Sequence, residues 1–228
     1  MKRKAMAAEA PLDAELERIK TAGIVAMFAD DDLMELLVLK GGNAMDIVHR
    51  ISSRSSVDLD FSMRDDLDCE AIRPKLEKAL KSTFELEGYL AFDVRLSQRP
   101  GKMPDDLASF WGGYLVEFKL ISLRRAKEVA FDIEIMRREA IRLGEGTKFM
   151  IDISRFEYVE DKVEYNLDGY RIFVYSPEMI VCEKIRAICQ QMPEYAKFIM
   201  RKGLGNQRAR DFVDIEVLVR ELKVDLSS

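Results

Sequence analysis

Several residue types that carry common protein chemistry are scarce in this chain of 228 residues, which has three cysteines, one histidine and one tryptophan. The cysteines form no C-x-x-C pair, so neither a disulfide framework nor a zinc site is predicted. Cys182 and Cys189 lie seven residues apart on a predicted helix and are expected to pack in the core. No triad partner stands near His49, which disfavours hydrolases that need a catalytic histidine and predicts a surface or supporting role.

Long apolar runs are also missing, and the segment 36–39 is among the longest. A bilayer span needs about 20 apolar residues, so no membrane segment is predicted. The basic start of the chain, MKRK, is not followed by an apolar signal core, and we expect a cytoplasmic protein. The net charge of −5 disfavours a nonspecific nucleic-acid coat protein but not an enzyme that handles nucleotides.

Along the chain, the spacing of the apolar residues matches the period of strands in some segments and the period of helices in others, which predicts an α+β fold. The predicted strands are 34–39, 57–63, 91–96, 114–121, 148–153 and 170–175. The predicted helices before residue 176 are 12–29, 44–51 and 68–87. This part of the chain, residues 1–175, is expected to form a mixed sheet with helices.

From Ser176 the pattern becomes helical. Ser176, Pro177 and Glu178 form an N-cap signal, with proline at the first helical position and an acid in the first turn. We therefore expect residues 176–228 to form a helical C-terminal region that packs on the module of residues 1–175.

The most informative segments are a glycine turn and a carboxylate strand. Gly41 and Gly42 follow a buried apolar run, and glycines there let the backbone approach a phosphate closely. In the strand, alternation places Asp58 and Asp60 on one face, opposite apolar residues. Two neighbouring carboxylates repel unless a cation or a proton lies between them, and an oxygen-only pair suits Mg²⁺.

Each of these segments has an ordinary structural explanation: Gly-Gly is usually a turn, and Asp-x-Asp is usually a solvated strand face. Their combination is more specific, because Mg²⁺ held by carboxylates and substrate phosphates is the arrangement that phosphoryl and nucleotidyl transfer use.

These segments resemble the AbiEii/AbiGii toxin family, within the nucleotidyltransferase superfamily that includes DNA polymerase beta. The family carries Lys-Gly-Gly-Thr-Ala-Leu and then Arg-x-Ser-x-Asp-Leu-Asp-Phe-Ser. Here residues 40–45 are KGGNAM and residues 54–62 are RSSVDLDFS. Weaker matches follow in the same order, namely IDIS at 151–154, YSPE at 175–178, EKIRA at 183–187 and RDFVD at 210–214.

The resemblance implies roles for particular residues. Asp58 and Asp60 would hold Mg²⁺, or Mn²⁺ in its place, and Asp152 is favoured as the third carboxylate, with Glu117 as the alternative. Lys184 would reach the triphosphate or be a solvated lysine. Asp211 would place the sugar or base, act as a base, or be an exposed helix acid. The residues expected to contact the nucleotide phosphates are Lys40, Gly41, Gly42, Ser56 and Arg210. The alternatives are that Ser56 only caps the strand and that Arg210 pairs with a nearby acid.

The implied reaction is transfer of a nucleoside monophosphate from an NTP, such as ATP, to an acceptor hydroxyl, with release of pyrophosphate. The implied setting is a bacterial toxin with a separately encoded antitoxin and an RNA acceptor, tRNA first. Basic residues that could form an RNA patch, or only a solvated helix pair, are Lys197, Arg201, Lys202, Arg208 and Arg210. The alternatives are an inactive nucleotide-binding module, a metal-dependent phosphohydrolase and transfer to a small molecule.

Overall fold

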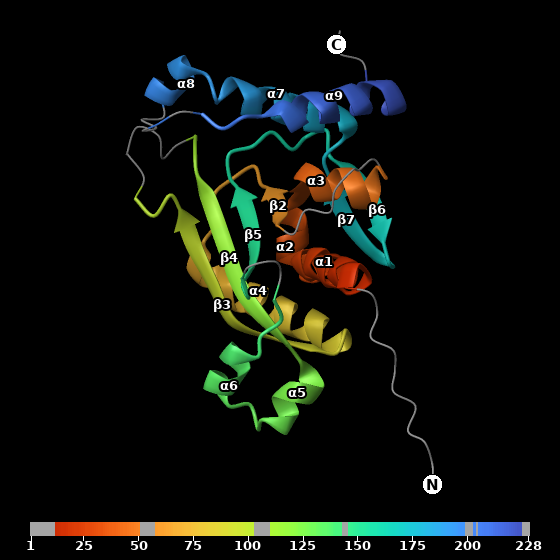
Figure 1. The fold of residues 1–228 in the computed structure, drawn as a ribbon. Coiled ribbons are helices and arrows are strands. Elements are labelled where there is room, and N and C mark those ends of the chain that lie inside the picture. Colours follow the sequence, from red (N-terminus) through yellow and green to blue (C-terminus); the bar gives the residue numbers. More distant parts are fainter. Residues whose placement is uncertain are drawn as a thin grey trace.

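A computed structural model describes residues 12–50, 58–102, 110–142, 146–198, 203 and 205–224. Within these residues the chain forms a mixed seven-stranded sheet flanked by helices (Figure 1), so the predicted α+β class is confirmed. The strand order across the sheet is β3-β4-β5-β2-β1-β7-β6. The strands are β1 (Val38–Lys40), β2 (Leu59–Ser62), β3 (Tyr89–Arg99), β4 (Gly113–Ser122), β5 (Phe149–Ser154), β6 (Val163–Leu167) and β7 (Tyr170–Val174).

The helices fall into three groups along the chain. Around the first strands lie α1 (Leu12–Phe28), α2 (Asp31–Leu36), α3 (Gly41–Asn43), the π-helix η1 (Ala44–Val48) and α4 (Cys69–Leu86). After β4 come α5 (Leu123–Glu128) and α6 (Ile133–Arg138). The C-terminal group is α7 (Pro177–Cys189), α8 (Pro193–Phe198) and α9 (Ala209–Leu222). This last group runs across one end of the sheet, and α5 and α6 lie at the opposite end (Figure 1).

Side-chain alternation gives the sheet two chemically different faces. Along β5, Phe149, Ile151 and Ile153 are buried, whereas Asp152 and Ser154 are half-buried. The apolar face packs against α1 and α4, as shown by the contact of Phe84 with Phe118 at 5.4 Å between ring centroids. The opposite face carries polar side chains on the central strands, among them Asp60 and Asp152, and it is the face on which the candidate site is built.

Strand register brings three charged residues into one row on that polar face. Lys40 of β1 pairs with Asp60 of antiparallel β2, and Asp60 pairs with Asp152 of parallel β5. Neighbouring strands lie about 4.8 Å apart, so the three side chains start close together. Residues 112 positions apart in the sequence thus become neighbours through strand pairing.

One expectation about the first predicted strand and one about α7 are wrong. The predicted strand 34–39 is helical in its first half, because the side chain of Asp30 accepts hydrogen bonds from the backbone of Asp32 and Leu33 and begins α2. Only the residues from Val38 onward join the sheet. Cys182 and Cys189 are exposed rather than packed in the core, since α7 buries Met179, Ile180 and Val181 instead.

A buried arginine after β5 joins the segment that follows β2 to the segment that precedes β4. The side chain of Arg155 is 5% exposed and donates from Nη1 to Asp66 Oδ2 at 2.7 Å. Its Nη2 donates to the carbonyl oxygen of Trp111 at 3.4 Å. The Asp66 carboxylate also accepts a hydrogen bond from Tyr114. Burial alone would raise the pKa of Asp66, but the hydrogen bonds from Tyr114 and Arg155 outweigh burial and lower it.

Replacing Arg155 with Met should lower the free energy of unfolding by about 1.5–3 kcal/mol, because it removes hydrogen bonds that involve charged groups. Urea unfolding measures this change. The matched control is Arg124→Met, whose side chain is 85% exposed and pairs with Glu128 at 3.5 Å. A surface pair contributes roughly 0–1 kcal/mol. Equal effects of the two substitutions would show that Arg155 is not an anchor.

Candidate functional site

A cavity of about 400 Å³ lies between the polar face of the sheet and the helices α7 and α9. Its wall on the sheet side includes Lys40, Gly41, Gly42 and Asp60. Its wall on the helix side includes Lys184, Arg186, Arg208 and Asp211. The structure therefore brings together six of the residues that the sequence nominated, namely Lys40, Gly41, Gly42, Asp60, Lys184 and Asp211.

The glycine turn has its shape because of a close approach to Asp60. Gly41 has a φ of +71°, a region that residues with a Cβ rarely adopt. A Cβ at this position would lie 2.8 Å from Asp60 Oδ2. Glycine at 41 is thus required both by the backbone conformation and by the carboxylate beside it. The turn leaves its backbone next to the carboxylate, where a phosphate and a cation could meet.

Asp60 and Asp152 form the carboxylate pair at the centre of the site. The pKa of Asp60 is raised to about 6, and burial is the largest cause. The nearby charge of Lys40 lowers this pKa, whereas the charges of Glu183, Asp152 and Asp58 raise it. Asp152 Oδ1 accepts a hydrogen bond from Arg99 Nη1 at 3.1 Å. Two adjacent half-buried carboxylates, one of them with a raised pKa, are a donor set that fits a hard divalent cation.

We expected Asp58 and Asp60 to share one strand, but Asp58 lies outside β2. It is exposed and lies just before β2, where its carbonyl oxygen accepts a hydrogen bond from Asn43 Nδ2 at 2.7 Å. Its charge nevertheless contributes to the raised pKa of Asp60. In the described part of the chain, no three histidine, cysteine or acidic side chains are grouped closely enough to hold a metal. Mg²⁺ commonly uses one or two protein carboxylates and takes its other ligands from water and phosphate.

Lys40 is a buried cation under the cavity. Its side chain is 7% exposed, and its Nζ lies 2.9 Å from Glu183 Oε1 and 2.9 Å from Ser154 Oγ. Burial alone would lower the pKa of Lys40, but the charges of Glu183 and Glu157 outweigh burial and raise it. Lys40 therefore stays positively charged beside Asp60, and through Glu183 it joins the sheet to α7.

Lys184 and Asp211 meet at the contact between α7 and α9. Lys184 Nζ lies 3.3 Å from Asp211 Oδ1 and 2.6 Å from Asp214 Oδ2. The side chains of Lys184 and Asp211 are each 12% exposed. Lys184 is therefore not a solvated lysine, and Asp211 is not an exposed helix acid. Arg208 Nη1 lies 3.5 Å from Asp211 Oδ2 and is a second cation at this position.

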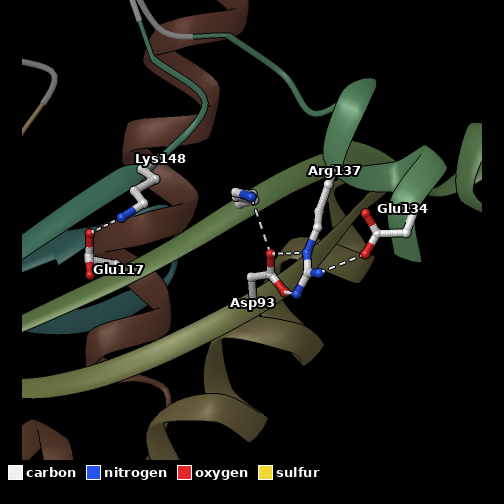
Figure 2. A network of polar contacts seen from close by, with 6 residues as sticks. Asp93, Glu117, Glu134, Arg137 and Lys148 are labelled. Carbon is white, nitrogen blue, oxygen red and sulfur yellow. Dashed lines mark hydrogen bonds and ion pairs between the residues drawn. The ribbon is translucent and has the colours of Figure 1, made fainter. Parts of the chain in front are cut away.

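Glu117, the alternative third carboxylate, lies away from the pair. Glu117 pairs with Met150 of β5, which is two residues before Asp152 on that strand. Its Oε1 lies 2.7 Å from Lys148 Nζ. Figure 2 shows this ion pair next to a second cluster in which Arg137 binds Asp93 and Glu134. Register thus places Asp152, and not Glu117, beside Asp60.

Other nominated residues stand apart from the cavity or outside the described residues. Arg210 is exposed and is not part of the wall, whereas Arg208, two residues earlier, is. Ser56, Arg201 and Lys202 lie outside the described residues. Sequence reasoning gave no site role to several residues that line the cavity or support it, namely Asn43, Trp111, Ser154, Glu157, Glu183 and Arg186. The sequence signal for four of them, Asn43, Ser154, Glu183 and Arg186, was their position inside the matched motifs; Trp111 and Glu157 had none.

The sequence and the fold were compared with known proteins. The model of a family described as nucleotidyl transferase AbiEii toxin, type IV TA system, matches residues 24–228. JHP933 from Helicobacter pylori has a TM-score of 0.50 and is 18% identical, over 92% of this chain and 67% of that one. An antigenic nucleotidyltransferase-like protein from Paracoccidioides brasiliensis has a TM-score of 0.44 and 18% identity, over 93% of this chain and 79% of that one. No curated protein matches the sequence.

Replacing Gly41 with Ala should abolish binding of nucleoside triphosphates, because the new Cβ would displace Asp60. Titration of the purified variant with each NTP measures this. The control is Gly169→Ala, which also has positive φ, +90°, but has open space around the position of its Cβ. Both variants should lose about 1–2 kcal/mol of stability from backbone strain. Normal nucleotide binding by the Gly41 variant would contradict the close approach.

A double-mutant cycle should detect the buried pair of Lys40 and Glu183. Lys40→Met and Glu183→Gln should each destabilise the protein by about 3 kcal/mol, because each leaves a poorly solvated partner. The double variant should lose less than the sum, with a coupling of roughly 1–3 kcal/mol in urea unfolding. The exposed pair of Arg220 and Glu216, 3.3 Å apart, serves as the control, with a coupling of about 0.5 kcal/mol or less. Additive effects at Lys40 and Glu183 would contradict the pairing.

Proposed function

The chain belongs to the AbiEii nucleotidyl transferase toxin family of type IV toxin–antitoxin systems, and we propose that it transfers a nucleoside monophosphate from an NTP to a hydroxyl of RNA. The resemblance predicted from the sequence motifs is confirmed by this membership, as is the nucleotidyltransferase class of enzyme. A toxin of this type implies a nucleotide substrate and an antitoxin as partner. The acceptor, the metal and the roles of individual residues are parts of the proposal.

The observation that carries the proposal is the row of Lys40, Asp60 and Asp152, of which Lys40 and Asp60 line the cavity. Asp60 and Asp152, with Asp58 beside them, would hold Mg²⁺ or Mn²⁺. The metal would supply Lewis-acid stabilisation of the charge on the phosphates. Asp152 would take the proton of the acceptor hydroxyl. The acceptor oxygen would then bond to the α-phosphorus, whose bond to the bridging oxygen breaks, and pyrophosphate would leave.

Cations on the helix side support the placement of the triphosphate. Lys184, Arg186 and Arg208 line the cavity opposite the glycine turn. Each of them already pairs with an acid, and those acids are Asp211, Asp214 and Glu157. Such paired cations are held in position before the substrate arrives, which reduces the cost of ordering them on binding. Lys40 would add positive charge below the glycine turn, and Ser56 would contact a phosphate.

The proposed setting is a bacterial toxin that acts in the cytoplasm on RNA, with tRNA as the first acceptor to test. No helix among the described residues has the length and apolarity that crossing a bilayer requires. We also propose the division into a nucleotidyltransferase module, residues 1–175, and a helical region, residues 176–228, that closes the cavity. The walls contributed by α7 and α9 support that division of labour.

Substituting the carboxylate pair should stop transfer. We expect Asp60→Asn and Asp152→Asn each to reduce label transfer from α-labelled NTP to RNA by at least about a hundredfold. A metal contributes several kcal/mol, and each 1.36 kcal/mol is a factor of ten in rate. Glu117→Gln is the matched control, because Glu117 lies on the same sheet but pairs with Lys148, and it should retain transfer.

The assay is run with each of the four NTPs, total RNA and Mg²⁺. Label that appears in RNA and is lost in both Asp variants supports the proposal. Label on a small product would replace RNA with a small-molecule acceptor, and free phosphate without transfer would indicate a phosphohydrolase. Toxicity that persists in the Asp60 and Asp152 variants would indicate an inactive nucleotide-binding module.

A further inference from the structure

A second cavity, of about 530 Å³, opens beside the first and is lined by Asp152 rather than Asp60. The two cavities share Trp111, Ser154 and Glu157 in their walls. The carboxylate pair therefore spans the boundary, with Asp60 on the side of the glycine turn and Asp152 on the other side. A group bound in the second cavity would lie next to Asp152 and across that boundary from the proposed triphosphate.

Trp111 forms part of the wall between the two cavities, and it is the one tryptophan in the sequence. Its carbonyl oxygen is held by the buried Arg155 side chain at 3.4 Å, and the backbone N–H of Arg155 donates to the Gly112 carbonyl at 3.0 Å. Trp111 is only partly buried, and it lines both cavities. Nucleobases stack on such aromatic rings whatever their identity.

Arg99 lies at the end of β3 and lines the second cavity. Its side chain is 55% exposed, and its Nη1 lies 3.1 Å from Asp152 Oδ1. A cation held by Asp152 would repel the guanidinium and weaken this pair, leaving the guanidinium to bind a phosphate inside the cavity. The two acids that line the cavity, Asp152 and Glu157, each pair with an arginine, which offsets their negative charge. The cavity therefore has little attraction for a polycationic acceptor.

We propose that the second cavity binds the terminal nucleotide of the acceptor RNA, with its base on Trp111 and its phosphate at Arg99. The hydroxyl of that nucleotide then faces Asp152. This inference rests on the proposed function and extends it, because it assigns the acceptor site to residues that neither the motifs nor the family match had nominated. Because stacking does not depend on the hydrogen-bonding edge of a base, this site would accept any of the four bases at the RNA terminus.

The test is binding of a short, fluorescently labelled single-stranded RNA to the full chain without NTP, followed by anisotropy. Trp111→Leu and Arg99→Gln should each raise Kd by roughly tenfold or more. Trp111→Phe, which keeps an aromatic face, should restore most of the affinity. The controls are Phe131→Leu, which removes another exposed aromatic ring, and Arg171→Gln, which removes a charge at β7; both should bind like the wild type. Circular dichroism checks that each variant is folded.

The Asp60→Asn variant separates this inference from the proposed function. It should bind RNA like the wild type and fail to transfer label, because Asp60 lines the first cavity and not the second. If Trp111→Leu and Arg99→Gln bind RNA normally while the wild type transfers label to RNA, the acceptor site is elsewhere and the inference is overturned. If the wild type binds RNA through Trp111 and Arg99 but transfers no label, the proposed reaction fails and the binding site stands.

Discussion

The buried charge of Lys40 is the interaction on which the site depends. Its ammonium group reaches Glu183 on α7 and Ser154 at the end of β5, each at 2.9 Å, while its backbone pairs with Asp60 in the sheet. A lysine that is 7% exposed needs such partners, because an unpaired buried charge costs several kcal/mol. One side chain thereby fixes the relative positions of the glycine turn, the carboxylate strands and the helix that covers them.

Charge compensation continues through the rest of the site. Asp152 pairs with Arg99, Glu157 with Arg186, and Lys184 with Asp211 and Asp214. Each pair joins different segments of the chain, so the same contacts that neutralise the charges also hold the walls of the two cavities together. Burial raises the pKa of Asp60 to about 6, even though Lys40 lies nearby. A half-buried carboxylate next to a second one is the local feature that a divalent cation would best satisfy.

Much of the fold followed from periodicity and capping. The alternation at β2 and β5 correctly predicted which side chains face the apolar core, and the Ser176 N-cap marked the start of α7. The prediction failed where a side chain acted locally, as Asp30 does in beginning α2. It also failed for Cys182 and Cys189, because helical spacing alone does not say which face of α7 meets the sheet. Strand β6 carries no buried apolar alternation and was not predicted.

By itself, the sequence determined the chemical inventory, namely a glycine turn and an Asp-x-Asp segment, and the family to which the chain belongs. Only the tertiary structure decided which residues meet. Strand register, a long-range property, placed Asp152 beside Asp60 and left Glu117 with Lys148. The packing of α7 on the sheet gave Lys40 its partner Glu183, and the approach of β4 to β5 placed Trp111 between two cavities. Such contacts depend on three-dimensional proximity between segments far apart in sequence, which local patterns of polarity do not encode.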